Sequence, residues 1–401
     1  MEPTTTETDR VRPIAEWLLI AGFLVALWLP IVDGVLGLDP TPSGVENTAA
    51  PQFPKLGAPA DLAAPRGLKS RLGRTARELR DFVSNGFGFR LALMRLHNAA
   101  QYRLLGRSAS PSVVLGKEGW LFYTNDKNLD DYRTAERLSP RDLKTWGRVL
   151  IERRDWLGAR GIRYLFVLAP NPHTIYPEFL PENLVKIREE TRLDQIAGYL
   201  TRETDLDILD LRPALRAAKL GGRLYHRTDT HWNQRGAFVA YREIARRLQS
   251  WFPSLRPIEE SDVVETTEIG PGGDLAGMLA LRDVYREEEF RVVPNRPLRA
   301  RGPKGEPLPY ETIVVKIRPL VESEIADPSL PKAVVIRDSY CSPLVPLLSE
   351  HFRRAVYVWQ MFDPALIEHE KPDVVIEESV ERLATSGLPA NPPGMTGKQS
   401  P

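Results

Sequence analysis

Residues 332–360 read KAVVIRDSYCSPLVPLLSEHFRRAVYVWQ, a stretch in which two apolar runs flank a helical pattern. The runs, at 332–340 and 355–360, are short and largely apolar, as is typical of strands buried on both faces of a parallel sheet. Residues 342–352 between them are predicted to be helical. A strand, a helix and a second strand in succession predict parallel strands with a helix packed on the sheet.

The same alternation continues on both sides of this stretch. It predicts an α/β protein with a mostly parallel sheet and helices on both of its faces. Residues 255–330 break the rhythm and are rich in Gly and Pro, so we expect an insertion or a cover over one sheet edge. The other predicted elements are helices at 139–161, 192–203 and 233–252, and strands at 162–170, 206–211 and 372–379.

Composition divides the 401 residues into a folded part and two flanks. Residues 39–70 are rich in Pro and Ala and are predicted to form an extended linker. Residues 385–401 are predicted to be a disordered tail, because they hold few residues that could build a core. Residues 71–384 between them are predicted to form one domain.

An apolar segment near the N-terminus predicts a single membrane-spanning helix at residues 14–38. Residues 17–32 carry no charge, and a bilayer crossing needs about 20 apolar residues. Arg10 and Arg12 precede the segment, so the positive-inside rule places residues 1–13 in the cytoplasm and the rest of the chain outside. The alternative is a cleaved signal peptide, although no small-x-small cleavage site closely follows the apolar run.

The overall charge and the cysteine content exclude some classes of protein. Lys and Arg number 54 and Asp and Glu 53, so no basic excess indicates a nucleic-acid partner. The single cysteine, Cys341, allows no intrachain disulfide and no multi-cysteine metal site. We expect Cys341 to serve as a small buried hydrophobic residue.

Three polar stretches follow or lie near the predicted strands. They are RDSYCS at 337–342, NPHTIYPE at 171–178 and TDTHW at 228–232. Ligand sites of open parallel sheets lie beyond the carboxyl ends of the strands. The three stretches therefore predict a functional site at that edge.

Ser339, His231 and Asp229 together suggest a nucleophile, its base and the group that orients the base. Ser339 ends a buried strand and opens a helix, where backbone N–H groups can stabilise an oxyanion. A serine needs a base, and His231 can take its proton. Asp229 stands two residues before His231 in an extended segment, so both side chains point to the same side.

Each of these residues also has a plainer interpretation. Ser339 alone would most simply be a helix N-cap, and Asp229 would cap the next turn. A metal site made by His226, Asp229 and His231 is a further alternative. We disfavour the metal because no second acidic or histidine cluster is evident on another element.

Five motifs, in this order, resemble the alginate O-acetyltransferases of the AlgJ/AlgX type, which are SGNH-hydrolase-like proteins. The resemblance covers roughly residues 110–383, and its Asp-Thr-His-Trp and Asp-Ser-aromatic motifs are specific in combination. Asp229 and His231 precede Ser339, which is similar to the circularly permuted order of the acetyltransferases. The motifs are GKEGWLFY (116–123), PNPHTIYPE (170–178), TDTHWNQRGA (228–237), GDLAGML (273–279) and VIRDSYCSPLVPLL (335–348).

The resemblance implies a three-layer α/β/α fold of the SGNH type and assigns Asp229, His231 and Ser339 as the catalytic triad. The Ser339 N–H, with Asn171, is expected to hold the oxyanion. Arg337 replaces the glycine that the family has before Asp-Ser, which would crowd the turn or bring a cation to the site. The residues expected to contact substrate, the aromatic ones by stacking on sugars, are Asn171, His173, Tyr176, Trp232, Arg337 and Tyr340.

The function implied is transfer of an acetyl group, through an acyl-serine, to hydroxyls of an exported polysaccharide. The resemblance implies no cofactor and no metal. It implies a multi-pass membrane acyltransferase as the acetyl supplier, with this chain anchored in the bacterial inner membrane and its catalytic domain in the periplasm. Two alternatives remain at this point: an esterase that deacetylates glycans, and a non-catalytic polysaccharide-binding or scaffold subunit.

Overall fold

The computed structural model describes residues 16–25, 28, 73, 76–77, 90–126, 128–308, 320–359, 362–393 and 395. The chain divides into two compact units, residues 1–104 and residues 105–401. The first unit contains a helical segment at 16–25, with helical Trp28, and most of α3 (Arg90–Leu105).

No helix within the described residues combines the length and apolar character that a membrane crossing requires. The remainder of the predicted anchor at 14–38 lies outside the described residues, as do residues 1–13 and the predicted linker at 39–70.

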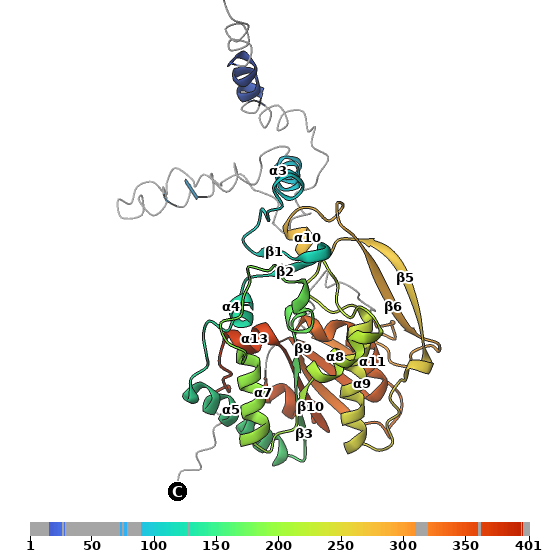
Figure 1. Cartoon of the computed structure of the whole chain (residues 1–401). Coiled ribbons are helices and arrows are strands. Elements are labelled where there is room, and N and C mark those ends of the chain that lie inside the picture. Colours follow the sequence, from blue (N-terminus) through green and yellow to red (C-terminus); the bar gives the residue numbers. More distant parts are fainter. Residues whose placement is uncertain are drawn as a thin grey trace, which may run out of the picture. The chain divides into compact units, whose positions relative to one another are not determined.

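The second unit contains a six-stranded sheet in the order β4-β3-β10-β8-β9-β7. Figure 1 labels β3, β9 and β10 of this sheet, with helices beside it. Neighbouring strands run parallel except at one edge, where β7 pairs with β9 in the antiparallel sense. The prediction of a mostly parallel sheet is therefore confirmed. The strands are β3 (Arg163–Ala169), β4 (Ile208–Asp210), β7 (Leu320–Glu324), β8 (Lys332–Arg337), β9 (Arg354–Trp359) and β10 (Val374–Val380).

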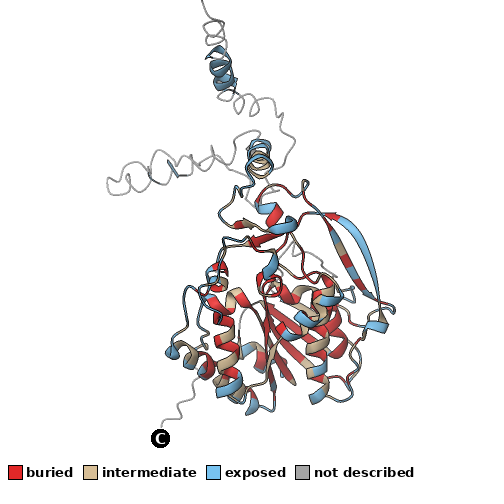
Figure 2. Ribbon diagram, in the orientation of Figure 1, coloured by how far each residue is buried: buried red, intermediate tan, exposed pale blue. Residues whose placement is uncertain are grey.

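Helices cover both faces of this sheet because successive strand residues point to opposite sides. In β3, Phe166 packs with Trp146 of α5 (Pro140–Gly158), in a cluster that also includes α7 (Arg192–Glu203). Val167 belongs to the opposite cluster, which includes Tyr241 of α9 (Gln234–Trp251) and one residue of α8 (Arg212–Ala218). Figure 2 shows the buried residues gathered in the strands and on the sheet-facing sides of these helices. The three-layer α/β/α arrangement is confirmed.

The Gly- and Pro-rich stretch at 255–330 forms a long antiparallel hairpin and then returns to the sheet. Its strands are β5 (Val263–Pro271) and β6 (Arg286–Pro294), and the short helix α10 (Asp274–Met278) lies between them in sequence. The stretch then supplies the edge strand β7.

The segment after β8 is not the single helix predicted at 342–352. It begins as the 3₁₀ helix η7 (Ser339–Leu344), continues as α11 (Val345–Leu348) and ends as η8 (Ser349–His351). Pro343 and Pro346 explain the difference, because a proline interrupts the hydrogen bonding of a continuous α-helix.

The prediction of a disordered tail at 385–401 is wrong for its first part. The buried guanidinium of Arg153 donates to Asn391 Oδ1 (2.8 Å) and to the carbonyl oxygen of Ala390 (2.7 Å). Met395 is buried in the same core cluster as α5. Buried donors need partners, and these contacts hold a segment whose composition alone suggested disorder. Residues 396–401 lie outside the described residues.

Shorter elements complete the described part of the second unit. An antiparallel pair, β1 with β2, precedes the first long helix, and short helices connect the larger elements. Their bounds are β1 (Val113–Leu115), η3 (Lys117–Gly119), β2 (Leu121–Tyr123), α4 (Asn128–Arg133), α6 (Pro172–Ile175), η4 (Pro177–Phe179), η5 (Lys219–Gly221), η6 (Glu260–Asp262), α12 (Pro364–Glu370) and α13 (Glu381–Ser386).

Candidate active site

Asp229, His231 and Ser339 form a continuous hydrogen-bonded relay. His231 Nδ1 lies 2.6 Å from Asp229 Oδ1, and His231 Nε2 lies 2.7 Å from Ser339 Oγ. Asp229 is 2 % exposed, whereas His231 and Ser339 are partly exposed. The base and the nucleophile are thus reachable, and the orienting carboxylate is buried behind them, as an acyl-transfer triad requires.

The TDTHW segment owes its shape to a tight antiparallel turn. Tyr225 and Trp232 form an isolated β-bridge, and His226 donates its backbone N–H to the carbonyl oxygen of His231 (3.2 Å). Asn233 then caps α9 by accepting from the backbone N–H groups of Arg235 and Gly236. The cap fixes where α9 begins and therefore how the preceding histidine is presented.

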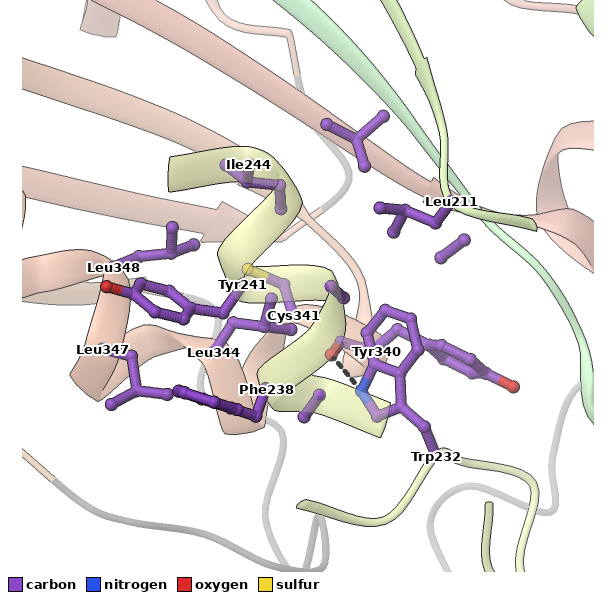
Figure 3. Close-up of a cluster of buried hydrophobic side chains, with 14 of the residues drawn as sticks. Leu211, Trp232, Phe238, Tyr241, Ile244, Tyr340, Cys341, Leu344, Leu347 and Leu348 are labelled. Atoms are coloured by element: carbon purple, nitrogen blue, oxygen red, sulfur yellow. Dashed lines mark hydrogen bonds between the residues drawn. The ribbon is translucent and has the colours of Figure 1, made fainter. Parts of the chain in front are cut away.

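Two hydrogen bonds join the segment that carries His231 to the turn that carries Ser339. The residues that they join stand 108 and 110 positions apart in the sequence. Trp232 Nε1 donates to the carbonyl oxygen of Tyr340 (3.0 Å), the bond drawn in Figure 3. The Tyr340 hydroxyl donates to the carbonyl oxygen of Thr230. The same view places Cys341 in the hydrophobic cluster beside Tyr241, which confirms that Cys341 is a buried hydrophobic residue.

Asp338 positions Ser339 from the preceding residue. Its Oδ1 accepts from the backbone N–H of Tyr340 (2.9 Å), and its Oδ2 accepts from that of Val380 (2.7 Å). The Asp338 backbone N–H in turn donates to Glu378 (3.1 Å). These bonds tie the carboxyl ends of β8 and β10 together, and burial raises the pKa of both carboxyl groups.

Asp274, in α10 of the insertion, is the most important residue that the sequence did not identify. Its backbone N–H donates to Asp229 Oδ2 (2.8 Å), and its carboxylate accepts from the N–H (2.8 Å) and hydroxyl (2.6 Å) of Thr230. Gly273 permits this approach, because a Cβ there would lie 2.5 Å from Asp229 Cβ. Asp274 lies within the GDLAGML motif at 273–279, and that motif was the feature of the sequence that could have identified it.

The pKa shifts of Asp229 and His231 favour their roles in a triad, and Asp274 responds to the same charges. Burial alone would raise the pKa of Asp229, but its hydrogen bond to His231 and the imidazole charge hold that pKa well below its usual range. Burial alone would lower the pKa of His231, yet the bond to Asp229 and its charge raise that pKa above 6.5. Burial and the Asp229 charge raise the pKa of Asp274 to about 6.

A metal alternative has to be considered again, because Asp229, His231 and Asp274 offer ligand atoms within 4.8 Å of one another. The expectation that no second acidic group would join from another element is therefore wrong. His226 is not part of this set, and its Nδ1 lies 3.7 Å from Glu287 Oε1. Both ring nitrogens of His231 are already engaged, by Asp229 and by Ser339, so hydrogen bonding accounts for the cluster.

Asn171 lies at the carboxyl end of β3, as predicted, and is almost fully buried. Its Nδ2 donates to Asn128 Oδ1 (2.7 Å), and its Oδ1 accepts from Arg382 (3.3 Å). Arg382 is a second residue that sequence reasoning missed, and its guanidinium carbon lies 5.2 Å from the Tyr340 ring centre. The role of Asn171 in an oxyanion hole stays a prediction.

Two of the three aromatic residues expected to stack on sugars, Trp232 and Tyr340, are covered by their neighbours. The exposed fractions are 4 % for Tyr176, 2 % for Trp232 and 0 % for Tyr340. Trp232 and Tyr340 pack edge to face against each other, with ring centres 4.8 Å apart, so neighbours cover the rings. The prediction that Trp232 and Tyr340 stack on sugars is therefore wrong, and these two residues join the catalytic loops instead. Tyr176 lines a cavity, and its stacking on sugars stays a prediction.

The two predicted basic contacts are also buried. Arg337 is 3 % exposed, donates to Ser342 Oγ (3.0 Å) and lies over the Trp359 ring, so it turns away from solvent. His173 is 1 % exposed and packs edge to face against Tyr132. Burial, followed by the charges of Arg382 and Lys186, lowers the pKa of His173 to about 3.

Comparisons with known proteins show which sequences this chain is similar to. Residues 113–305 match the family described as the SGNH hydrolase-like domain of the acetyltransferase AlgX. A probable alginate O-acetylase AlgJ of Pseudomonas syringae pv. tomato is 25 % identical over 287 residues, which are 70 % of this chain and 70 % of that protein. The corresponding protein of Azotobacter vinelandii is 28 % identical over 226 residues, 54 % of this chain and 55 % of its own.

A solved structure supports the fold. The DHHW family protein from Eubacterium siraeum aligns with a TM-score of 0.51 at 17 % sequence identity, covering 69 % of this chain and 96 % of that one. At this identity the likeness concerns the fold alone.

Proposed function

Because the chain belongs to the AlgX/AlgJ family of SGNH hydrolase-like acetyltransferases, we propose that it transfers acetyl groups from Ser339 to hydroxyls of an exported polysaccharide. The observation that carries the proposal is the relay of 2.6 Å and 2.7 Å contacts from Asp229 through His231 to Ser339. A non-catalytic scaffold has no need of a buried carboxylate aligned on a reachable histidine and serine.

In the first half-reaction, His231 Nε2 takes the proton of Ser339 Oγ as that oxygen attacks the acetyl carbonyl carbon. The resulting oxyanion collapses, the donor group leaves with the proton from His231, and an acetyl ester remains on Ser339. The Ser339 N–H, at the start of η7, is the proposed oxyanion donor, with Asn171 as its partner. Asp229 stabilises the imidazolium of His231 between the two proton transfers.

In the second half-reaction, a sugar hydroxyl replaces the donor group. His231 removes its proton, the hydroxyl oxygen attacks the acetyl carbon, and Ser339 leaves with the proton returned by His231. Water in place of the sugar would give an acetyl esterase. Both reactions use the same relay, so the balance between them depends on how far the bound acceptor excludes water.

The setting of the reaction is part of the proposal. Residues 14–38 anchor the chain in the bacterial inner membrane, and the catalytic unit lies in the periplasm. A multi-pass membrane acyltransferase supplies the acetyl group, since cytoplasmic acetyl donors do not reach that compartment. The uncharged segment at 17–32 supports the anchor.

The test is an assay of the full chain with a chromogenic acetyl ester, with and without oligosaccharide acceptors. Acetylated oligosaccharide detected by mass spectrometry supports transfer. Release of acetate alone, at a rate that acceptors do not change, would identify an esterase. Absence of both activities, with binding of the oligosaccharide retained, would favour the scaffold.

A further inference from the structure

A cation-rich cavity lies at the carboxyl edge of the sheet, away from the triad. Its volume is about 470 Å³, within the range of about 300–1,000 Å³ that is usual for small-ligand sites. Residues of α4, α6, α7 and α8 line it, together with the segment that carries Lys186. Its charged lining residues are Lys186, Arg212, Arg216, Lys219 and a single carboxylate, Asp194.

Only two of these four cations have a carboxylate partner within the described part of the chain. Arg212 pairs with Asp194 and Asp210, and Lys219 pairs with Glu178 (2.6 Å). Neither Lys186 nor Arg216 makes an ion pair with a described residue. Lys186 Nζ instead lies 5.0 Å from the centre of the Tyr132 ring. The cavity therefore carries positive charge that the surrounding fold leaves uncompensated.

His173 supplies a second, independent indication of a ligand. It lines the cavity, is 1 % exposed, and its Nε2 has no hydrogen-bond partner among the residues that the structure describes. A buried polar atom without a partner destabilises the fold, and a bound group that pairs with it can remove that cost. The lowered pKa keeps the ring neutral, so His173 offers a hydrogen bond without adding to the charge.

The sheet order places this cavity at a defined distance from the nucleophile. Ser339 follows β8, His173 follows β3 and Arg212 follows β4, in the order β4-β3-β10-β8. Neighbouring strands lie about 4.8 Å apart, so the cavity is about 10–14 Å from Ser339 along the edge. That separation is too large for the reacting acetyl group and suits a neighbouring unit of a bound polymer.

A larger cavity of about 760 Å³ lies next to it and shares Lys219, but its charge is balanced. Its four cations, Lys219, Arg223, Arg227 and Arg286, face four carboxylates, Glu118, Glu178, Glu287 and Glu288. The excess of positive charge thus belongs to the smaller cavity.

We propose that the cavity around His173, Lys186 and Arg216 is an anion subsite. It binds a carboxylate or phosphate substituent of the acceptor polysaccharide, on a unit beyond the one that is acetylated. This inference rests on the proposed function, because it takes the ligand to be the acceptor.

Binding to the full-length Ser339→Ala variant tests the subsite without turnover. Isothermal titration calorimetry would compare an oligouronate, its carboxyl-reduced neutral form and a phosphorylated oligosaccharide. The double change Lys186→Gln with Arg216→Gln is set beside Lys144→Gln, an exposed lysine outside the cavities described above. Thermal melting confirms that each variant is folded.

The expected result is weaker binding of an acidic ligand to the double variant, by about 3- to 30-fold, with no change for the neutral form or for Lys144→Gln. The acidic ligand that responds identifies the source of the negative charge. Equal losses for acidic and neutral ligands, or no loss at all, would overturn the subsite. If acidic ligands respond as expected and no acetyl transfer is found, the subsite stands and the proposed transferase activity fails.

Discussion

Asp274 donates its backbone N–H to Oδ2 of Asp229 over 2.8 Å, although the two residues stand 45 positions apart. The bond leaves Asp229 Oδ1 to accept from His231, through both its ring nitrogen and its backbone N–H. The insertion between the main strands therefore takes part in the catalytic geometry, because it holds the triad carboxylate from behind.

Gly273→Ala should reduce activity strongly while Gly277→Ala should not. A Cβ at Gly273 would lie 2.6 Å from Asp229 Oδ2 and would push the carboxylate away from His231. At Gly277, inside the helix α10 that Gly273 precedes, the nearest atom would be 3.5 Å away, an ordinary contact. The kcat/KM for a chromogenic acetyl ester and the melting temperature of both variants check this. Equal activities would show that the approach of Gly273 does not position Asp229.

The acidic limb of the pH–rate profile should lie above pH 6.5 and move to lower pH in Asp274→Asn. The base must be neutral, so activity falls as the pH drops through the raised pKa of His231. Asp274 contributes to that rise, because its Oδ2 lies 3.9 Å from His231 Nδ1. Profiles of kcat/KM for both proteins give the two midpoints. A midpoint that stays in place or rises in Asp274→Asn would refute this role.

Asp229→Asn should lower kcat by about 10⁴-fold, because an amide favours the wrong tautomer of His231. His231→Ala should lose at least as much. The double variant should lose little more than His231→Ala alone, since residues that act as one unit are not additive. Steady-state kinetics of the three variants measure the coupling, and fully additive losses would mean that Asp229 acts independently of His231.

Chelators should leave the activity unchanged. Asp229, His231 and Asp274 lie close enough to hold an ion, but hydrogen bonds within the site already engage them. The assay is ester turnover after dialysis against a chelator, followed by addition of zinc. Inactivation that zinc reverses would assign the cluster to metal chemistry instead of a triad.

The sequence predicted correctly those strands and helices whose formation depends on a local pattern of apolar residues. The apolar runs at β3 and β8 predicted buried strands, and α7 has the bounds that its periodicity indicated. The prediction of a single helix after Ser339 was wrong because Pro343 and Pro346 divide the segment. This local effect outweighed the apolar pattern of the segment.

Features that depend on distant segments were not predictable from local patterns. Trp232 and Tyr340 resemble sugar-stacking residues in sequence, and only the packing of their two loops shows that their rings are covered. Asp274 reaches Asp229 through the fold of the insertion, which no periodicity describes. The tail was misjudged for the same reason, since its partner is the buried Arg153.

The most direct test of the account is the mass of the protein after brief exposure to an acetyl ester without acceptor. Intact and peptide mass spectrometry should find one acetyl group on Ser339 of the full chain, removed when an oligosaccharide acceptor is added. The Ser339→Ala variant should carry none. An acetyl group that persists in Ser339→Ala, or turnover by the unaltered chain through another acylated residue, would contradict Ser339 as the nucleophile.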